Sequence, residues 1–240
     1  MEVIPQWKIA QVGEKGLWDG LVYHDEYILR VLTDNAARAA SVRKALPSMP
    51  STCVEIGIGP FGLGVSAFLP EIGSRFAADP LTPVSFTENG RAVRESTKSV
   101  YQYMSQLREG IQYVRTLGEE LPFRSASFDF AACCNVLDHT SDPDAVLAEI
   151  FRVLRPGACF FFDVDTFSLM GLLKWHAYTK RVHKKEILVT THPYRMLEPD
   201  VVRRLRSAGF VLRKLDGHSG LSAWVGHARL SAFLATKPAS

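Results

Sequence analysis

The sequence predicts an α/β protein with one doubly wound, mostly parallel sheet. From residue 52 onward, short apolar segments typical of strands alternate with amphipathic segments typical of helices, which is the order that parallel strands with right-handed crossovers require. A glycine-rich turn over 57–62 follows the first of these strands. Residues 128–135 form a nearly continuous apolar run, as expected of a strand that is covered on both faces.

The first fifty residues are predicted to form an N-terminal helical cap, followed by a main domain over 51–240. A short helix over 5–16 is bounded by Pro and Gly, and a longer one is expected over 24–46. The longer helix places four apolar residues on one stripe at helical spacing: Tyr27, Ile28, Val31 and Leu32. Two prolines, Pro47 and Pro50, then end the helical structure.

The main domain is predicted to contain seven strands, the last two of which pair antiparallel at one sheet edge. The strand segments are 52–58, 74–78, 111–115, 128–135, 158–164, 210–215 and 227–236. Helices are expected from the glycine turn through residue 69, in broken form over 81–106, over 142–154 and over 199–208. Residues 155–157 are expected to form a turn, and 166–197 a helical insertion after the fifth strand.

Composition bounds the class of protein. A chain of 240 residues can bury a sizeable core without disulfides or metal. The net charge of +3 is too small to indicate a nucleic-acid partner by itself, and none is expected. The most apolar stretch is interrupted by Asp163 and Asp165, so it falls short of the roughly 20 apolar residues of a membrane-spanning helix. No basic segment followed by an apolar run stands at the start, so no secretory signal is expected.

All four cysteines lie in apolar, strand-like runs. Cys133 and Cys134 are adjacent, so their side chains should point to opposite faces of one strand, which suits neither a metal site nor a disulfide. Reduced core thiols are therefore predicted, and with them a cytoplasmic location. No metal site is expected. The oligomeric state is left open, a homodimer included.

The glycine turn admits more than one ligand. Gly57, Gly59 and Gly62 satisfy the spacing of a nicotinamide-binding turn, and they could also serve only to make a tight bend. Glu55 favours a different ligand, since a carboxylate facing the turn would attract the cationic methionine end of S-adenosylmethionine and repel a pyrophosphate. Asp79, at the end of the second strand, can accept hydrogen bonds from both hydroxyls of a ribose.

The chain resembles the class I S-adenosylmethionine-dependent methyltransferases, in particular the methyltransferase-11-like subgroup. The resemblance rests on the order and spacing of four blocks: VEIGIGPFG, the AADPL strand end, GEELPFRSASFDFAACCNVLDHTSDPDAVLAEIFRVLRPGA and the terminal strand pair. It covers 51–165 densely and 198–237 loosely. It implies a Rossmann-like fold, S-adenosylmethionine as cofactor and S-adenosylhomocysteine as its product.

The resemblance also implies a set of cofactor contacts. Glu55, Gly57, Gly59 and Asn135 would lie near the methionine end, and Asp79 would hold the ribose. The adenine would be bordered by Pro80, Gly118 and Glu119. The position before Gly118 often carries an adenine-binding Asp in this family, whereas here it is Leu117, so that contact would need Glu119 or a backbone carbonyl.

Methyl transfer from a sulfonium is an in-line displacement, for which a protein chiefly aligns the acceptor and excludes water. A hydroxyl acceptor also benefits from a general base, and His is the usual choice. The sequence offers His139, after the fourth strand, and His192, in the insertion, as catalytic candidates; both could instead only shape their loops. Asp138, Tyr194 and Trp175 are the candidate acceptor contacts.

The predicted function is O-methylation of a small-molecule, sugar or lipid-like acceptor. The insertion begins apolar and turns basic, so it is either a plain capping helix or a lid for a greasy or negatively charged acceptor. Two other functions compete with this one. A protein that binds the cofactor without catalysis is compatible with the same residues. A nicotinamide-dependent oxidoreductase fits less well, because it leaves Glu55 and the NVLDH block without a purpose.

Overall fold

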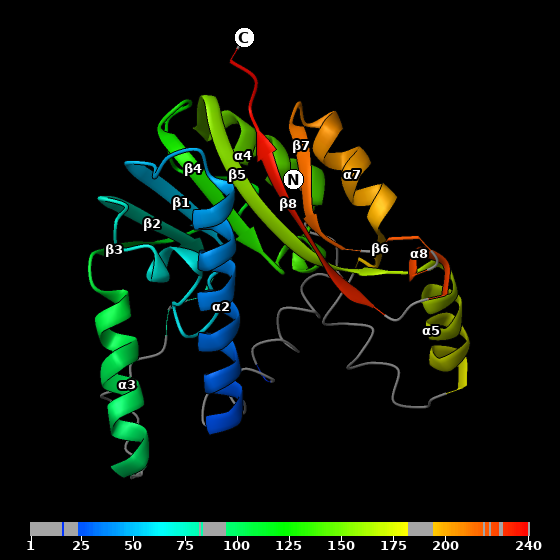
Figure 1. The fold of residues 1–240 in the computed structure, drawn as a ribbon, viewed down its shortest axis with the longest axis horizontal. Helices are drawn as coiled ribbons and strands as arrows, with labels where there is room; N and C mark the ends of the chain where they lie inside the picture. Colours follow the sequence, from blue (N-terminus) through cyan, green and yellow to red (C-terminus); the bar gives the residue numbers. More distant parts are fainter. Residues whose placement is uncertain are drawn as a thin grey trace.

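The computed structural model describes residues 16, 24–81, 83, 95–181, 194–217, 219–220, 222–225 and 228–239. In these residues seven strands follow the order β3-β2-β1-β4-β5-β8-β7, and the two-residue β6 pairs with the end of β5. Helices flank the sheet (Figure 1). The predicted α/β class with a mostly parallel sheet is confirmed.

The strand bounds lie close to those expected. The strands are β1 Thr52–Ile56, β2 Ser74–Asp79, β3 Ile111–Arg115, β4 Phe128–Cys134, β5 Leu154–Phe167, β6 Met196–Leu197, β7 Val211–Asp216 and β8 Arg229–Thr236. Only β8 runs antiparallel to its neighbours, and it lies between β5 and β7. The described helices are α2 Asp25–Ala45, α3 Glu95–Arg108, α4 Pro143–Val153, α5 Leu169–Arg181, α7 Glu198–Ser207 and α8 Ser222–Val225, with short 3₁₀ turns η1 Val65–Phe68 and η2 Leu137–His139.

Local chemistry explains the helix ends. Asp142 caps α4, since its carboxylate accepts hydrogen bonds from the N–H groups of Asp144 and Ala145 at 3.0 and 3.1 Å, and Pro143 occupies the first turn. Helix α2 ends at Ala45, and the next residue, Leu46, has the extended backbone that a residue before proline adopts.

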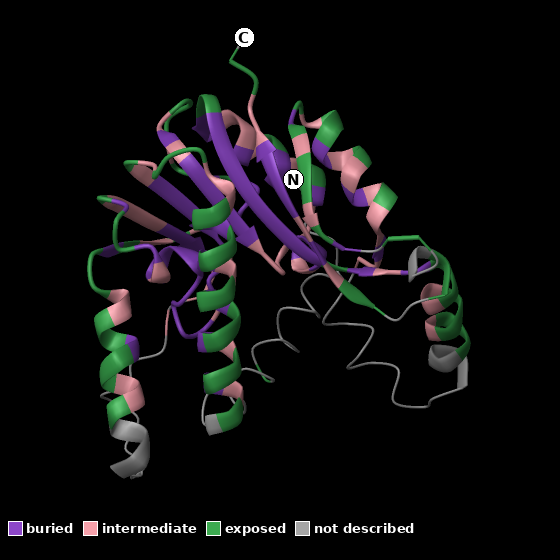
Figure 2. Ribbon diagram, in the orientation of Figure 1, coloured by how far each residue is buried: buried purple, intermediate pink, exposed green. Residues whose placement is uncertain are grey.

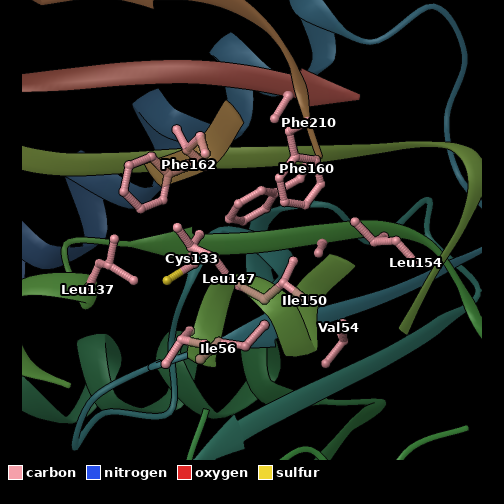
Figure 3. Packing of buried hydrophobic residues seen from close by; sticks show 14 of the residues in the cluster. Val54, Ile56, Cys133, Leu137, Leu147, Ile150, Leu154, Phe160, Phe162 and Phe210 are labelled. Carbon is pink, nitrogen blue, oxygen red and sulfur yellow. The ribbon is translucent and has the colours of Figure 1, made fainter. Parts of the chain in front are cut away.

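The core has two main layers, one on each face of the sheet. On one face α2 and η1 pack over β1 and β4 through Ala39, Val42, Val65 and Leu69. On the other face α4 and α7 pack over β4, β5 and β8, and Figure 3 shows the packing of Ile150, Phe160 and Phe162 there. The central strands are buried almost throughout, while the helices expose their outer sides (Figure 2). Cys133 and Cys134 face opposite layers, as predicted.

The prediction of a helix between the glycine turn and residue 69 is wrong. The structure has only the four-residue η1 there. Gly62 and Gly64 disfavour helix on one side, and Pro70 cannot continue a helix on the other. The turn expected over 155–157 lies inside β5 as an irregularity, since Leu154 pairs with Phe128 and Cys159 pairs with Phe130. Gly157 there has a φ of 80°.

Of the two helices predicted for the N-terminal cap, the structure describes only the second. The helix expected over 5–16 lies outside the described residues, apart from Gly16. Helix α2 packs directly into the core, so it belongs to the same packed unit as the sheet. The boundary between cap and main domain stays a prediction. None of the described helices has the length and apolar character needed to cross a membrane.

Candidate functional site

A cavity of about 970 Å³ lies at the carboxyl ends of the parallel strands and continues beside α2. This is the edge of a doubly wound sheet at which ligands bind. The lining falls into two parts, according to the elements that carry it. The strand-end part is lined by Ile56, Gly57, Ile58, Gly59, Asp79, Pro80, Leu81, Leu117, Gly118, Glu119, Asn135, Val136, His139 and Thr140. The α2 part is lined by Arg30, Asp34, Ala37, Arg38, Ser41, Phe161, Asp163, Asp165, Leu215, Asp216, Leu230 and Ala232.

The glycine turn brings bare backbone to the cavity. Gly57 and Gly59 have φ values of 72° and 64°, in the left-handed region that favours glycine. A Cβ at Gly57 would lie 2.3 Å from Cγ2 of Val136, whereas a Cβ at Gly59 would have no atom within 4 Å. Gly57 is therefore required for packing at the strand end, and Gly59 leaves open space beside the backbone that a ligand can enter.

Glu55 does not line this cavity. Its side chain is 1% exposed, and its carboxylate accepts hydrogen bonds from the N–H groups of Val65 and Ser66 at 2.7 and 2.8 Å. The Ser66 hydroxyl donates a third at 2.6 Å. Burial raises the pKa of Glu55, and the hydrogen bonds from Ser66 and Val65 oppose that rise. In this structure Glu55 anchors the segment behind the glycine turn, and its place near the methionine end stays a prediction.

Asp79 lies in the cavity wall, where it was expected. It is 6% exposed, at the end of β2. One carboxylate oxygen accepts from the Gly59 N–H at 3.0 Å and the other from the Leu81 N–H at 2.7 Å. Burial raises its pKa, and these backbone hydrogen bonds partly oppose the rise. Each oxygen retains a second lone pair, so the carboxylate can still accept from a ribose.

The adenine candidates also line the strand-end part. Pro80, Leu117 and Gly118 present mostly apolar surface there. Glu119 is 8% exposed, and its Oε1 accepts from the N–H groups of Ser141 and Asp142 and from the Ser141 hydroxyl. Glu119 therefore fixes the start of α4 against the loop after β3.

Asn135 and His139 come together after β4. Asn135 has a φ of 53°, and its N–H donates to the Asp163 carbonyl at 2.9 Å. His139 lines the cavity, and its Nε2 lies 3.6 Å from Oδ2 of the buried Asp138. Asp138 itself is 3% exposed and stands behind His139, outside the lining. At 3.6 Å the carboxylate lies beside the imidazole beyond hydrogen-bond distance of Nε2, and the other ring nitrogen, Nδ1, is buried.

The other acceptor candidates do not reach the cavity. Tyr194 donates from its hydroxyl to the Ser141 carbonyl at 2.8 Å, and Trp175 stacks under the Arg195 guanidinium, which lies 4.3 Å from its ring centroid. Neither side chain belongs to the cavity lining. The Tyr194 hydrogen bond ties the end of the insertion to the domain, whereas the Trp175–Arg195 contact lies within the insertion. His192 lies outside the described residues.

Sequence reasoning missed the contribution of α2. Arg38 donates to Asp163 from Nε at 2.6 Å and from Nη2 at 3.3 Å, and the Asn35 amide donates to the Leu63 carbonyl at 3.0 Å. These contacts tie α2 to β5 and to the glycine turn. The available signal was a second, polar stripe at helical spacing beside the apolar one: Arg30, Asp34, Arg38 and Ser41.

The strand-end part fits the cofactor that the sequence predicts. Its buried carboxylate, open glycine and apolar adenine border match a ribose, a close backbone approach and a base. The cavity volume of about 970 Å³ stands near the top of the roughly 300–1,000 Å³ typical of a small-molecule site.

Comparison with known proteins agrees with this arrangement. A family model described as a methyltransferase domain matches residues 61–162. The ubiquinone biosynthesis O-methyltransferase of Hahella chejuensis is 45% identical over 54 residues, which are 22% of this chain and 23% of that protein. The chain spans about a quarter to two fifths of the length of the curated relatives it matches.

Two solved structures share the fold over nearly the whole chain. A 1,6-didemethyltoxoflavin-N1-methyltransferase of Burkholderia thailandensis, crystallised with S-adenosylhomocysteine, has a TM-score of 0.58 at 21% identity and covers 99% of this chain and 92% of its own. An S-adenosylmethionine-dependent methyltransferase of Thermotoga maritima has a TM-score of 0.56 at 18% identity and covers 97% and 99%. Residues 61–162 thus match a methyltransferase domain, and nearly the whole chain shares the fold of these two solved methyltransferases.

Proposed function

We propose that the protein transfers a methyl group from S-adenosylmethionine to a small-molecule acceptor. The observation that carries the proposal is the single cavity that joins Asp79 and the glycine turn to His139 and to the α2 part. The bound cofactor supplies an activated methyl group on its sulfonium. The protein's own task is then to hold the acceptor in line with that bond and to exclude water.

We propose that the acceptor atom is an oxygen. His139 would accept the proton of the acceptor hydroxyl while Asp138 orients the imidazole ring of His139. The imidazole in the cavity wall, with a carboxylate 3.6 Å from its Nε2, supports this assignment. The related proteins differ on this point, since one is named an O-methyltransferase and another an N1-methyltransferase. A cytoplasmic location also stays a prediction.

Calorimetry of the whole chain with S-adenosylmethionine, S-adenosylhomocysteine and NADH tests the cofactor. We expect both sulfur compounds to bind and NADH not to bind. Binding of NADH alone would overturn the proposal in favour of an oxidoreductase. Transfer of a radiolabelled methyl group to a panel of phenols, amines and thiols then tests activity. Cofactor binding with no transfer to any of them would favour a protein that binds S-adenosylmethionine without catalysis.

A further inference from the structure

The α2 part of the cavity is a groove between α2 and one face of the sheet. Residues that alternate along each strand reach the same face, and three strands contribute to this one. Phe161, Asp163 and Asp165 come from β5, and Leu230 and Ala232 come from β8. Leu215 comes from the far end of β7. Opposite them, the polar stripe of α2 forms the second wall.

Different elements line this groove and the strand-end part, and the two parts meet where β4 lies beside β5. Asn135 lines the strand-end part and Asp163 lines the groove, and the Asn135 N–H donates directly to the Asp163 carbonyl. A ligand in the groove would therefore have one end beside the strand-end part. The groove lies on the α2 side of the sheet, whereas α5 with Trp175 and the loop at Tyr194 do not line it.

The chemistry of the walls limits what the groove can bind. Its sheet side is mostly apolar, through Phe161, Leu215, Leu230 and Ala232. Four carboxylates line it against two guanidinium groups: Asp34, Asp163, Asp165 and Asp216 against Arg30 and Arg38. Arg38 is already paired with Asp163, and Arg30 lies over the Tyr27 ring at 5.0 Å. Asp216 pairs with Arg229, which stands outside the lining, so the carboxylates exceed the guanidinium groups by one. A phosphate or carboxylate would meet excess negative charge there.

We propose that the body of the methyl acceptor binds in the α2 part, which selects acceptors that are neutral or cationic over acceptors that carry phosphate or carboxylate. The inference rests on the proposed function and names the substrate class of that site. In this proposal α2 and β8, and not the insertion, form the surface that determines specificity. The acceptor is then neutral or cationic, whereas the sequence suggested a greasy or negatively charged one.

Three probes that share one ring test the charge preference: phenol, tyramine and phenyl phosphate. With the full chain saturated with S-adenosylhomocysteine, saturation-transfer NMR should detect binding of phenol and tyramine and not of phenyl phosphate. Preferred binding of phenyl phosphate would overturn the inference, and so would binding of none of the three probes.

Two substitutions on opposite walls locate the probes. Ala232→Phe fills the groove from β8, and Ser41→Phe narrows it from an exposed position on α2. Each should weaken tyramine binding by about tenfold, because added bulk in an occupied site must displace the ligand. Val211→Phe is the matched control, since Val211 is 63% exposed at the opposite end of β7 from Leu215. If tyramine binds unchanged to both groove variants, the inference fails.

Calorimetry with S-adenosylhomocysteine separates this failure from failure of the proposed function. All three variants should retain the wild-type affinity for S-adenosylhomocysteine, which also shows that they fold. If the wild-type chain does not bind S-adenosylhomocysteine, the proposed function itself fails. If the wild-type chain does bind S-adenosylhomocysteine, but tyramine binds equally well to the wild type and to both groove variants, only the assignment of the α2 part is overturned.

Discussion

Glu55 occupies the space that a side chain at Gly64 would need: a Cβ built at Gly64 would lie 2.1 Å from Oε1 and 2.4 Å from Oε2 of the Glu55 carboxylate. Both residues are buried, and the carboxylate is held in place by Val65 and Ser66. The segment between the glycine turn and η1 is thus fixed by one buried acid and one missing side chain.

Gly64→Ala should therefore lower the free energy of unfolding by about 1–3 kcal/mol, because the methyl group displaces a carboxylate that satisfies three donors. Urea denaturation measures the change. Gly73→Ala is the matched control, since the nearest atom to its added Cβ is 3.7 Å away. Equal stability of the two variants would show that the Glu55 side chain relocates without cost.

Asp79→Ala should weaken binding of S-adenosylmethionine by about 1–3 kcal/mol, through the loss of charge-assisted hydrogen bonds to the ribose. Calorimetry measures the change, and Asp200→Ala on the exposed surface of α7 is the control. A circular dichroism spectrum shows whether the turn survives without the hydrogen bonds to Gly59 and Leu81. Unchanged affinity in a folded variant would mean that the ribose is held elsewhere.

His139→Ala should lower turnover of a hydroxyl acceptor by roughly 10²–10⁴-fold while leaving cofactor affinity nearly unchanged, as expected for a general base. His176→Ala removes an exposed imidazole from α5 and should change neither quantity. The two are compared by methyl-transfer rate at saturating cofactor. Near-wild-type turnover of the His139 variant would remove it as the base.

Asp163 gives the stability of the protein a specific pH dependence. Its burial raises the pKa to about 6 from the usual 3.8, against the attraction of Arg38. The folded state then binds this proton more tightly than the unfolded chain, so the contribution of Asp163 to the free energy of unfolding falls as pH rises from about 4 to about 6.

Asp163→Asn cannot ionise, so its stability should lack this fall. The difference between wild type and variant, measured by urea denaturation at several pH values, should shift against the wild type as pH rises from about 4 to about 6. Asp200→Asn provides a control with an exposed carboxylate. Parallel curves for wild type and the Asp163 variant would contradict the prediction.

The sequence predicted the elements that rest on strong, local signals. The apolar run of β4 and the capped, amphipathic α4 are examples, because burial on both faces and the Asp142 cap are written in neighbouring residues. The placement of Asp79 in the cavity wall also followed from its position at a strand end. The prediction of a helix after the glycine turn was wrong because it rested on the strand–turn–helix order alone. It did not take into account that Gly64 and Pro70 disfavour a helix there.

The acceptor side of the site depended on contacts between distant segments. Arg38 and Asp163 are 125 residues apart, and only the fold shows that they pair between α2 and β5. The polar stripe of α2 resembles an ordinary solvated helix face when it is read alone. Conversely, Tyr194 and Trp175 are aromatic residues near the site in sequence, but their partners, Ser141 and Arg195, hold them outside the cavity lining.

The position of β8 between β5 and β7 affects the order in which the sheet can be completed. During synthesis β7 emerges before β8, but it has no strand partner other than β8 among the described residues. The edge of β5 must also wait for residues 229–236 to pair. A nascent chain halted before Arg229 would expose an unpaired edge of the central sheet, which is a template for aggregation. Synthesis of β8 is thus the step that closes this edge, and truncations that remove it should aggregate rather than merely fray.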